Sequence, residues 1–147
     1  MRGMWLTRIA FGIGEVFINL STGLAGALVP MYIARGMAPP GIAVPEGPFT
    51  LFAMHAYAAL ITLLGLTEAV VMWRADRRVV RATVACLLVG DILHLTAWLP
   101  GFLPNPVWNS ASIGTLGVIG ALIPLRLLAL ALLRAPRGAG AATEARA

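Results

Sequence analysis

The chain of 147 residues is 59% hydrophobic and only 12% charged, whereas soluble domains carry about 25% charged residues. This composition excludes an ordinary soluble domain and predicts an integral membrane protein, with one domain at this length. The net charge is +5, and the basic side chains are all arginine. Because the arginines flank apolar runs and form no face with interleaved aromatics, we expect a membrane as the partner and no nucleic acid.

Four apolar segments are expected to cross the membrane, each close to the roughly 20 residues that a spanning helix needs. They cover residues 7–34, 49–73, 79–99 and 110–133. We therefore predict an all-α fold, an integral membrane four-helix bundle within residues 1–134. The small, polar segment 135–147 is predicted to be a disordered cytoplasmic tail.

The connections between these segments carry clear turn signals. Prolines and glycines fill 36–48, a tight basic turn occupies 74–78, and a loop with Pro and Asn covers 100–109. Glycines in the first segment (Gly12, Gly14, Gly23, Gly26) and in the fourth (Gly114, Gly117, Gly120) are expected to allow close helix approach. Pro124 is expected to kink the fourth helix.

Arginine placement predicts the orientation. Nine of the eleven arginines fall on the side that holds both termini and the turn at 74–78, while Arg35 lies on the other side and Arg126 within the fourth segment. By the positive-inside rule, the termini and this turn are cytoplasmic. A bacterial plasma membrane is the expected location. The first segment is too long for a signal h-region and contains Glu15, so we expect no cleaved signal peptide.

Each segment places one ionisable side chain at depth. Counted from the cytoplasmic arginines at 1.5 Å per residue, Glu15, Glu68, Asp91 and Arg126 lie roughly 9–15 Å inside the membrane. Asn19 continues this polar track one turn beyond Glu15. Lipid offers such groups no partner, so we expect them to face the interior of the bundle.

The stretch 84–98 concentrates this chemistry on the third segment. Asp91, His94 and Trp98 fall on one helix face at their spacing. Trp98 is either an interfacial anchor or the wall of a pocket, and His55 lies near the outer end of its segment, where it meets the interface.

The charges within the segments do not balance. A single guanidinium cannot neutralise three carboxylates, so at least one carboxyl is expected to be protonated, and a neutral acid in an apolar cavity is a proton donor. The structural alternative is a hydrogen-bonded network that fixes the helix register.

No metal or other cofactor is expected. The two histidines, His55 and His94, lie at different depths, and no HExxH, CxxC, Gly-rich phosphate loop or GxSxG occurs. Cys86 is the single cysteine, which excludes an internal disulfide.

The residues also resemble a known group. GEVF (14–17), the basic turn, VVRATVACLLVGDILHL (79–95), VWN (107–109) and LR (125–126) resemble a group of small membrane proteins of fungi and actinobacteria. Some actinobacterial members are similar to drimentine-type membrane terpene cyclases, which cyclise a prenyl chain already attached to an indole or similar scaffold. The resemblance covers most of the chain and implies Glu15, Asp91, His94 and Arg126 as site residues. Glu68 has no counterpart in it, and the paired signature of the seven-helix fungal meroterpenoid cyclases is not found.

The expected function is an integral membrane terpene cyclase. A buried carboxylic acid would protonate an alkene or epoxide of a prenylated substrate, for example of the farnesyl-indole type, that enters from the lipid. Asp91 is the expected acid and His94 restores its proton, while Glu15 or Glu68 is its partner. Arg126 holds the ionised carboxylate. The substrate-binding residues would be Trp98, Phe17 and Phe52, whose rings stabilise a carbocation, and Asn19.

Two alternatives remain open from the sequence. A double-bond isomerase acting on a sterol-like or prenyl lipid would use the same donor and acceptor, although the His-and-Glu spacing of the small sterol isomerases is not reproduced. A non-enzymatic lipid-binding or assembly subunit would instead pair its buried charges with a partner helix. The sequence is compatible with an oligomer.

Overall fold

The computed structural model describes residues 2–38, 41–104, 106, 108 and 110–134. These residues form helices and connections, without a strand, as the sequence predicts. The predicted tail 135–147 lies outside them. The elements are α1 (Arg2–Ile9), the π-helix η1 (Ala10–Glu15), α2 (Val16–Leu28), α3 (Pro30–Met37), α4 (Pro48–Arg74), α5 (Arg77–Phe102) and α6 (Ser110–Leu132).

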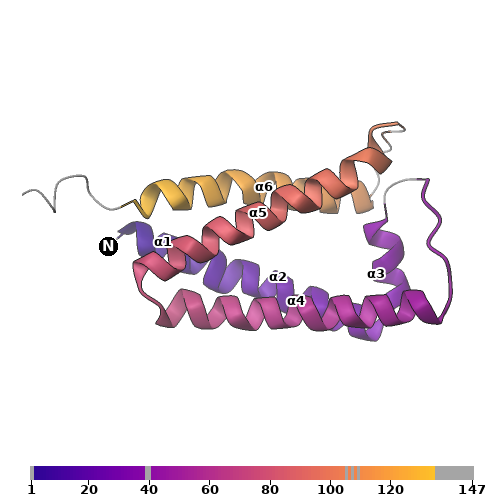
Figure 1. The fold of residues 1–147 in the computed structure, drawn as a ribbon, viewed down its shortest axis with the longest axis horizontal. Coiled ribbons are helices and arrows are strands. Elements are labelled where there is room, and N and C mark those ends of the chain that lie inside the picture. Colours follow the sequence, from indigo (N-terminus) through magenta and orange to yellow (C-terminus); the bar gives the residue numbers. More distant parts are fainter. Residues whose placement is uncertain (1, 39–40, 105, 107, 109, 135–147) are drawn as a thin grey trace, which may run out of the picture.

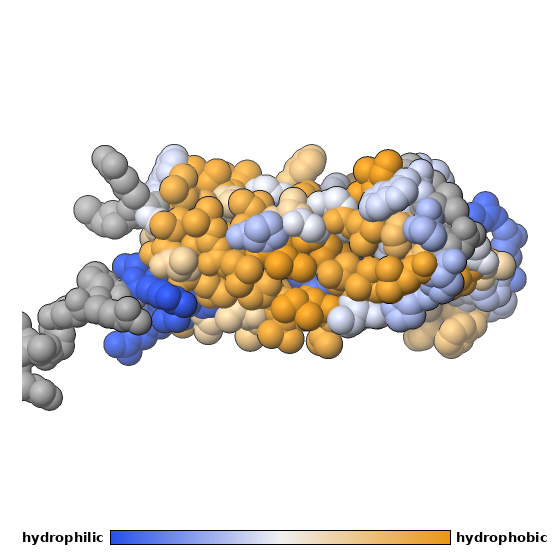
Figure 2. Space-filling view, turned by 90° about the horizontal axis from the view of Figure 1, so that it is seen from above, coloured by the Kyte–Doolittle hydropathy of each residue, from blue (hydrophilic) through white to orange (hydrophobic). Residues whose placement is uncertain are grey.

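Within the described residues, four helical stretches are long and apolar enough to cross a membrane. These candidate spans are Gly3–Leu28, Pro48–Arg74, Arg77–Phe102 and Thr115–Leu132. Figure 2 shows a largely hydrophobic middle, with hydrophilic residues gathered toward the two ends of the molecule. This arrangement supports the prediction of a membrane protein with four apolar helices.

The first span ends earlier than predicted. The expected segment 7–34 is wrong at its end, because α2 stops at Leu28 and Val29 leaves the helical region (φ −133°, ψ 57°). Proline disfavours the α conformation in the residue before it and lacks an N–H to continue the helical bonds. Pro30 therefore closes α2 and becomes the first residue of the separate helix α3.

A π-helical turn interrupts the first span between α1 and α2. The Val16 N–H bonds to the carbonyl of Phe11, five residues earlier, as well as to that of Ile13. In an α-helix it would bond to Gly12. The indole N–H of Trp73 donates to this Gly12 carbonyl at 3.1 Å, so α4 supports the irregular turn. Glu15 is the last residue of that turn.

The predicted turn at 74–78 is a capped helix start. Asp76 is the N-cap of α5, and its carboxylate accepts hydrogen bonds from the N–H groups of Arg78 (2.8 Å) and Val79 (3.0 Å). Aspartate is favoured here because it satisfies N–H groups that have no partner within the helix. This cap places α5 directly after α4.

Two prolines lie inside helices. Contrary to the predicted loop at 100–109, α5 continues through Pro100 to Phe102. Phe102 is buried and stacks on Trp98, with ring centroids 5.0 Å apart, and this packing holds the last turn. Pro124 lies within α6, which is a single helical element.

The helices form two layers (Figure 1). One contains α1, η1 and α2 beside α4, the other α5 beside α6, and α3 lies across the end opposite the N terminus. Glycines bring α2 and α4 together: a Cβ on Gly26 would lie 3.1 Å from the Ala58 Cβ, and one on Gly65 would lie 3.0 Å from the Asn19 Cβ.

The glycine prediction is confirmed for only one segment. Gly12, Gly23 and Gly26 each contact α4 closely, whereas Gly14 has no close neighbour outside its own helix. A Cβ on Gly117 or Gly120 of α6 would meet no atom within 4 Å. The surroundings of Gly114 lie outside the described part of the chain.

The apolar core lies toward the end that holds the N terminus. Arg77 ties α5 to α6 there, because its guanidinium donates to the carbonyls of Leu132 (2.8 Å), Leu133 (3.2 Å) and Arg134 (2.7 Å). The core cluster consists of Phe11, Met72, Val80, Val84, Ala129 and Leu133.

Replacing Gly12 with alanine is expected to destabilise the protein. The added Cβ would lie 2.9 Å from the Met72 Cβ and 3.0 Å from the Trp73 Nε1, and such overpacking costs about 1–3 kcal/mol. Gly117→Ala is the matched control, because its Cβ would meet open space. Thermal unfolding in detergent should show a lower midpoint for Gly12→Ala and no decrease for Gly117→Ala. Equal midpoints would contradict the tight packing of η1 on α4.

The Asp76 cap is expected to make stability depend on pH. The N–H groups of Val79 and Arg78 hold the pKa of the Asp76 carboxyl below its ordinary value of 3.8. The ionised cap therefore stabilises the folded state above pH 3.8, and this contribution disappears as the pH falls through the folded-state pKa. Unfolding midpoints of the wild type and Asp76→Asn should differ at neutral pH and converge below pH 3.8. Because both proteins contain the other carboxyl groups, the difference between their midpoints at each pH reports on Asp76 alone. A difference that does not change with pH would contradict this role of the Asp76 charge.

Candidate functional site

The guanidinium of Arg126 lies at the centre of a buried group of charges. Its side chain is 1% exposed. It donates through Nε to the Asp91 Oδ2 (2.6 Å) and through Nη2 to the Asp91 Oδ1 (3.5 Å) and the Glu15 carboxylate. The Phe11 ring lies 5.3 Å from the Arg126 Cζ, within cation–π range. One side chain of α6 thus joins the first span to α5.

A second buried pair lies beside this one. The Asn19 Nδ2 donates to the Glu68 Oε2 at 3.2 Å, and both side chains are buried. The absence of a side chain at Gly65 lets α2 approach α4 at this level, because Asn19 occupies the space that a Cβ there would need. We call these five residues the polar cluster: Glu15, Asn19, Glu68, Asp91 and Arg126.

The polar cluster contains oxygens without a hydrogen-bond donor. The Glu15 Oε2 and the Glu68 Oε1 are both buried and have no partner, and the Arg126 Nη1 is a buried donor without an acceptor. The ionised carboxylates of Glu15 and Glu68 would repel each other within one buried cluster. A proton on one of them converts it into a donor to the other and satisfies both oxygens.

The single cation of the cluster is shared unevenly among the three acids. Arg126 binds Glu15 and Asp91, while Glu68 receives a hydrogen bond only from Asn19 among the described contacts. With one proton on the Glu15–Glu68 pair, the three acids and Arg126 carry a net charge of about −1. Asp91 is 15% exposed, so it is the member of the cluster that reaches the surface.

His94 does not join the polar cluster. It is exposed, whereas Asp91 is half-buried and Trp98 is buried. The narrow buried face of α5 contains Val80, Val84 and Trp98. At about 100° per residue, a position three residues after Asp91 is turned about 60° away from it, which places His94 at the edge of that face.

Trp98 ties α5 to α3. Its indole N–H donates to the carbonyl of Met37, the last residue of α3, at 3.1 Å. Its ring stacks on Phe102, which meets Trp108 edge to face at 5.2 Å. Trp98 lies two turns from Asp91, toward the α3 end, and therefore anchors that end of the molecule.

Phe17 and Phe52 lie away from the polar cluster. Their side chains are 72% and 71% exposed, so the structure does not bring these expected substrate-binding rings to the acids. The aromatic ring at the cluster is Phe11, which the sequence analysis missed. Its spacing of four residues before Glu15 was the available signal.

The geometry of the donors fits no metal site within the described residues, since no three or more His, Cys, Asp or Glu side chains are grouped to hold an ion. Comparison with protein-family models, curated proteins and solved structures finds no match to this chain. The chemistry of the polar cluster is therefore the basis for inferring a function.

Removing the central guanidinium should destabilise the fold strongly. Arg126→Met leaves the Glu15 and Asp91 carboxylates buried without a cation, and breaking a buried pair in this way costs about 3–5 kcal/mol. The exposed Arg134→Met is the control. A double variant, Arg126→Met with Glu15→Gln, should recover part of the loss in a thermal unfolding series. Single and double variants with wild-type midpoints would show that the cluster contributes nothing to stability.

Proposed function

We propose that this protein is a membrane-embedded enzyme that protonates an alkene or epoxide of an isoprenoid substrate and so starts carbocationic cyclisation. The helices form a bundle across the membrane, with both termini and the α4–α5 turn on the cytoplasmic side. The arginines at that end support this orientation, because basic residues are enriched in cytoplasmic segments.

One observation carries the proposal: Glu15 and Glu68 are buried carboxyl groups that each keep an oxygen without a donor, in a cluster of three acids with a single cation, Arg126. A shared proton satisfies both oxygens in the resting state. Among apolar helices, this proton is separated from water, and an acid in a dry site can transfer it to a carbon–carbon double bond without competition from solvent.

The structure favours Glu68 over Asp91 as the acid. Asp91 receives two hydrogen bonds from the permanently charged Arg126, and such a pair stabilises the ionised carboxylate. Glu68 has a neutral partner in Asn19. Glu68 is therefore assigned as the proton donor and Glu15 as its partner. Arg126 is the cation that pairs with Glu15 and orients it, and Asp91 binds the same guanidinium.

The reaction needs no net proton. Glu68 transfers its proton to the substrate double bond, and a second double bond of the substrate attacks the resulting cation and closes a ring. The final cation then loses a proton to the Glu15–Glu68 pair, which restores the acid. The net negative charge of the cluster after proton transfer stabilises the cation electrostatically.

A double-bond isomerase is the second candidate, and one observation favours it. Phe17 and Phe52 are exposed and Trp98 lies two turns away, so these three rings do not enclose the acids. A cyclase stabilises a series of cations along the folded chain, whereas an isomerase stabilises one cation next to the acid pair. The same carboxyl groups serve both reactions.

Glu68→Gln should abolish turnover while leaving the protein folded. The amide cannot supply the proton, but it keeps the shape of the side chain and a hydrogen-bonding partner for Asn19. Membranes that contain the wild type or Glu68→Gln would receive farnesylated indole-type precursors, and mass spectrometry would detect a product with the precursor's mass and a shifted retention time. Nuclear magnetic resonance of the product distinguishes cyclisation from isomerisation.

Glu46→Gln is the matched control, since Glu46 is exposed and pairs with Arg35 far from the cluster. It should retain wild-type turnover. Full activity of Glu68→Gln would refute its assignment as the acid. A folded wild type that returns this whole class of precursors unchanged would reject the substrate class and favour a structural or binding role for the cluster.

A further inference from the structure

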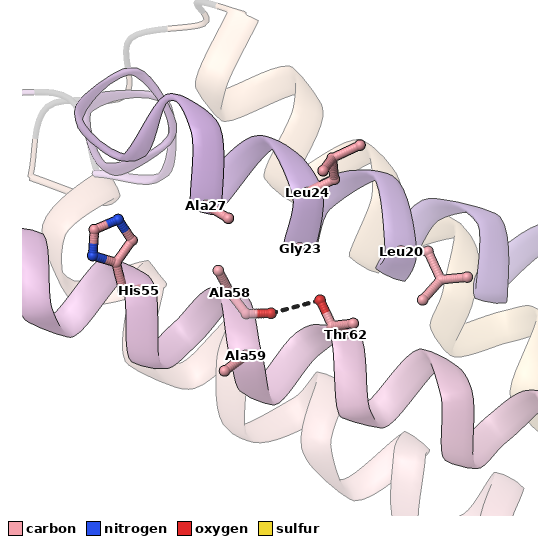
Figure 3. A pocket seen from close by; sticks show the side chains of 8 residues that line it. All are labelled: Leu20, Gly23, Leu24, Ala27, His55, Ala58, Ala59 and Thr62. Atoms are coloured by element: carbon pink, nitrogen blue, oxygen red, sulfur yellow. Dashed lines mark hydrogen bonds between the residues drawn. The ribbon is translucent and has the colours of Figure 1, made fainter.

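A groove follows the seam between α2 and α4. It has a volume of about 400 Å³, within the range of small-molecule sites. Figure 3 shows His55 toward one end and Leu20 toward the other, with Gly23 and Ala58 between them. The lining residues are Leu20, Gly23, Leu24, Ala27, His55, Ala58, Ala59 and Thr62.

The groove is apolar along most of its length. The Thr62 hydroxyl donates to the Ala58 carbonyl at 2.8 Å, so its proton is already used within the helix. His55 is the lining residue with a free hydrogen-bonding ring, and it is exposed toward the α3 end. Such a lining matches an amphiphile with a hydrocarbon tail and one polar end.

The groove also lies within two candidate spans, Gly3–Leu28 and Pro48–Arg74. The first and last lining residues of each helix, Leu20 and Ala27 in α2 and His55 and Thr62 in α4, are seven positions apart. This corresponds to a length of about 10 Å. In the proposed membrane orientation, His55 lies near the outer interface and the rest of the groove lies among lipid chains, so a ligand enters the groove laterally from the bilayer.

The end marked by Leu20 points to the polar cluster. The Leu20 side chain packs where a Cβ on Gly65 would lie, with its Cδ2 3.3 Å from that point. Asn19 precedes Leu20 in the chain, and Glu68 follows Gly65 by one turn of α4. Leu20 and the Asn19 Cβ close this end of the groove over Gly65. A chain in the groove therefore ends about one turn of α4 before Glu68 and reaches it when these two side chains are displaced.

We propose that this α2–α4 groove binds the isoprenoid tail of the substrate, with the polar end of the substrate at His55 and the distal double bond toward Glu68. This inference rests on the proposed function. Along α4, His55 and Glu68 are about 20 Å apart, so the substrate contains several isoprene units. Protonation at the distal end of such a chain is the step that starts cyclisation toward the polar end.

The test measures binding separately from turnover. Full-length Glu68→Gln protein in phospholipid nanodiscs would be irradiated with a farnesylated indole that carries a diazirine on its tail, and the labelled peptides would be identified by mass spectrometry. Label is expected on the segments of α2 and α4 that line the groove. Because this variant lacks the proposed acid, labelling does not depend on catalysis.

Two alanines of α4 provide a matched pair of variants. Ala59 lines the groove, whereas Ala56 is exposed one turn away and does not line it. Ala59→Phe fills the groove and should reduce labelling about tenfold or more, while Ala56→Phe should leave it unchanged. His55→Ala should weaken labelling by the indole-bearing probe more than labelling by a farnesyl hydrocarbon without a polar end.

Three outcomes would overturn the inference: label elsewhere on the protein, equal labelling of the two phenylalanine variants, or equal displacement of the probe by a saturated acyl chain. The last would identify the groove as a site for bilayer phospholipid. If the groove is labelled but the wild-type protein shows no turnover, the binding site would be supported and only the proposed cyclase activity would be rejected.

Discussion

The burial of the Arg126 guanidinium is the constraint on which the rest of the structure depends. A permanently charged side chain that is 1% exposed between apolar helices requires anionic partners, because an unpaired charge is too costly there. Glu15 and Asp91 supply them from the first span and from α5. One ionic contact on each of these helices therefore turns an acidic side chain toward α6, while close glycine packing sets the face of the first span that meets α4.

Close packing then brings the remaining acid into range. Gly65 lets Asn19 approach α4, and Asn19 in turn binds Glu68. Glu68 thus lies beside Glu15 although Arg126 gives it no hydrogen bond. The result is a division of labour among three carboxyl groups. Asp91 and Glu15 compensate the guanidinium, while Glu68 is bound by the neutral amide of Asn19. The same packing that stabilises the fold buries this third carboxyl group without a cation of its own.

The sequence predicts the charged residues of the polar cluster better than the shape of the helices that carry them. The sequence predicts that Glu15, Glu68, Asp91 and Arg126 face the interior of the bundle, and the structure brings these four side chains together, because a charged residue in an apolar segment has few alternatives to the interior. The first span shows the limit of this reasoning. Pro30 is a helix-breaking signal, but the apolar run continues past it, so the sequence predicts one helix to residue 34. The sequence AFGIGE contains no feature that distinguishes a π-helical turn from an α-helical one.

Aromatic residues and histidine were harder to place. Lipid accepts a phenylalanine on any face of a helix, so apolarity says nothing about whether Phe11 or Phe17 faces inward. His94 has the right spacing from Asp91, but α5 packs along so narrow a face that a rotation of about 60° removes it from the interior. These positions depend on how far each helix is covered by its neighbours, which is a property of the assembled fold.

The π-helical turn divides the first span into two parts with separate rotational settings. One additional residue within a turn shifts every later side chain by about 100° relative to a continuous α-helix. Phe11 can thereby face the core near the N terminus while Glu15, Asn19 and Gly26 face their partners farther along. The extra residue rotates α2 relative to α1. The Trp73 indole N–H stabilises this irregular turn, because it donates to the Gly12 carbonyl that has lost its α-helical partner. Two residues of α4 therefore affect the position of Glu15. Glu68 lies in the same polar cluster, and the Trp73 ring supports the π-helical turn that ends at Glu15.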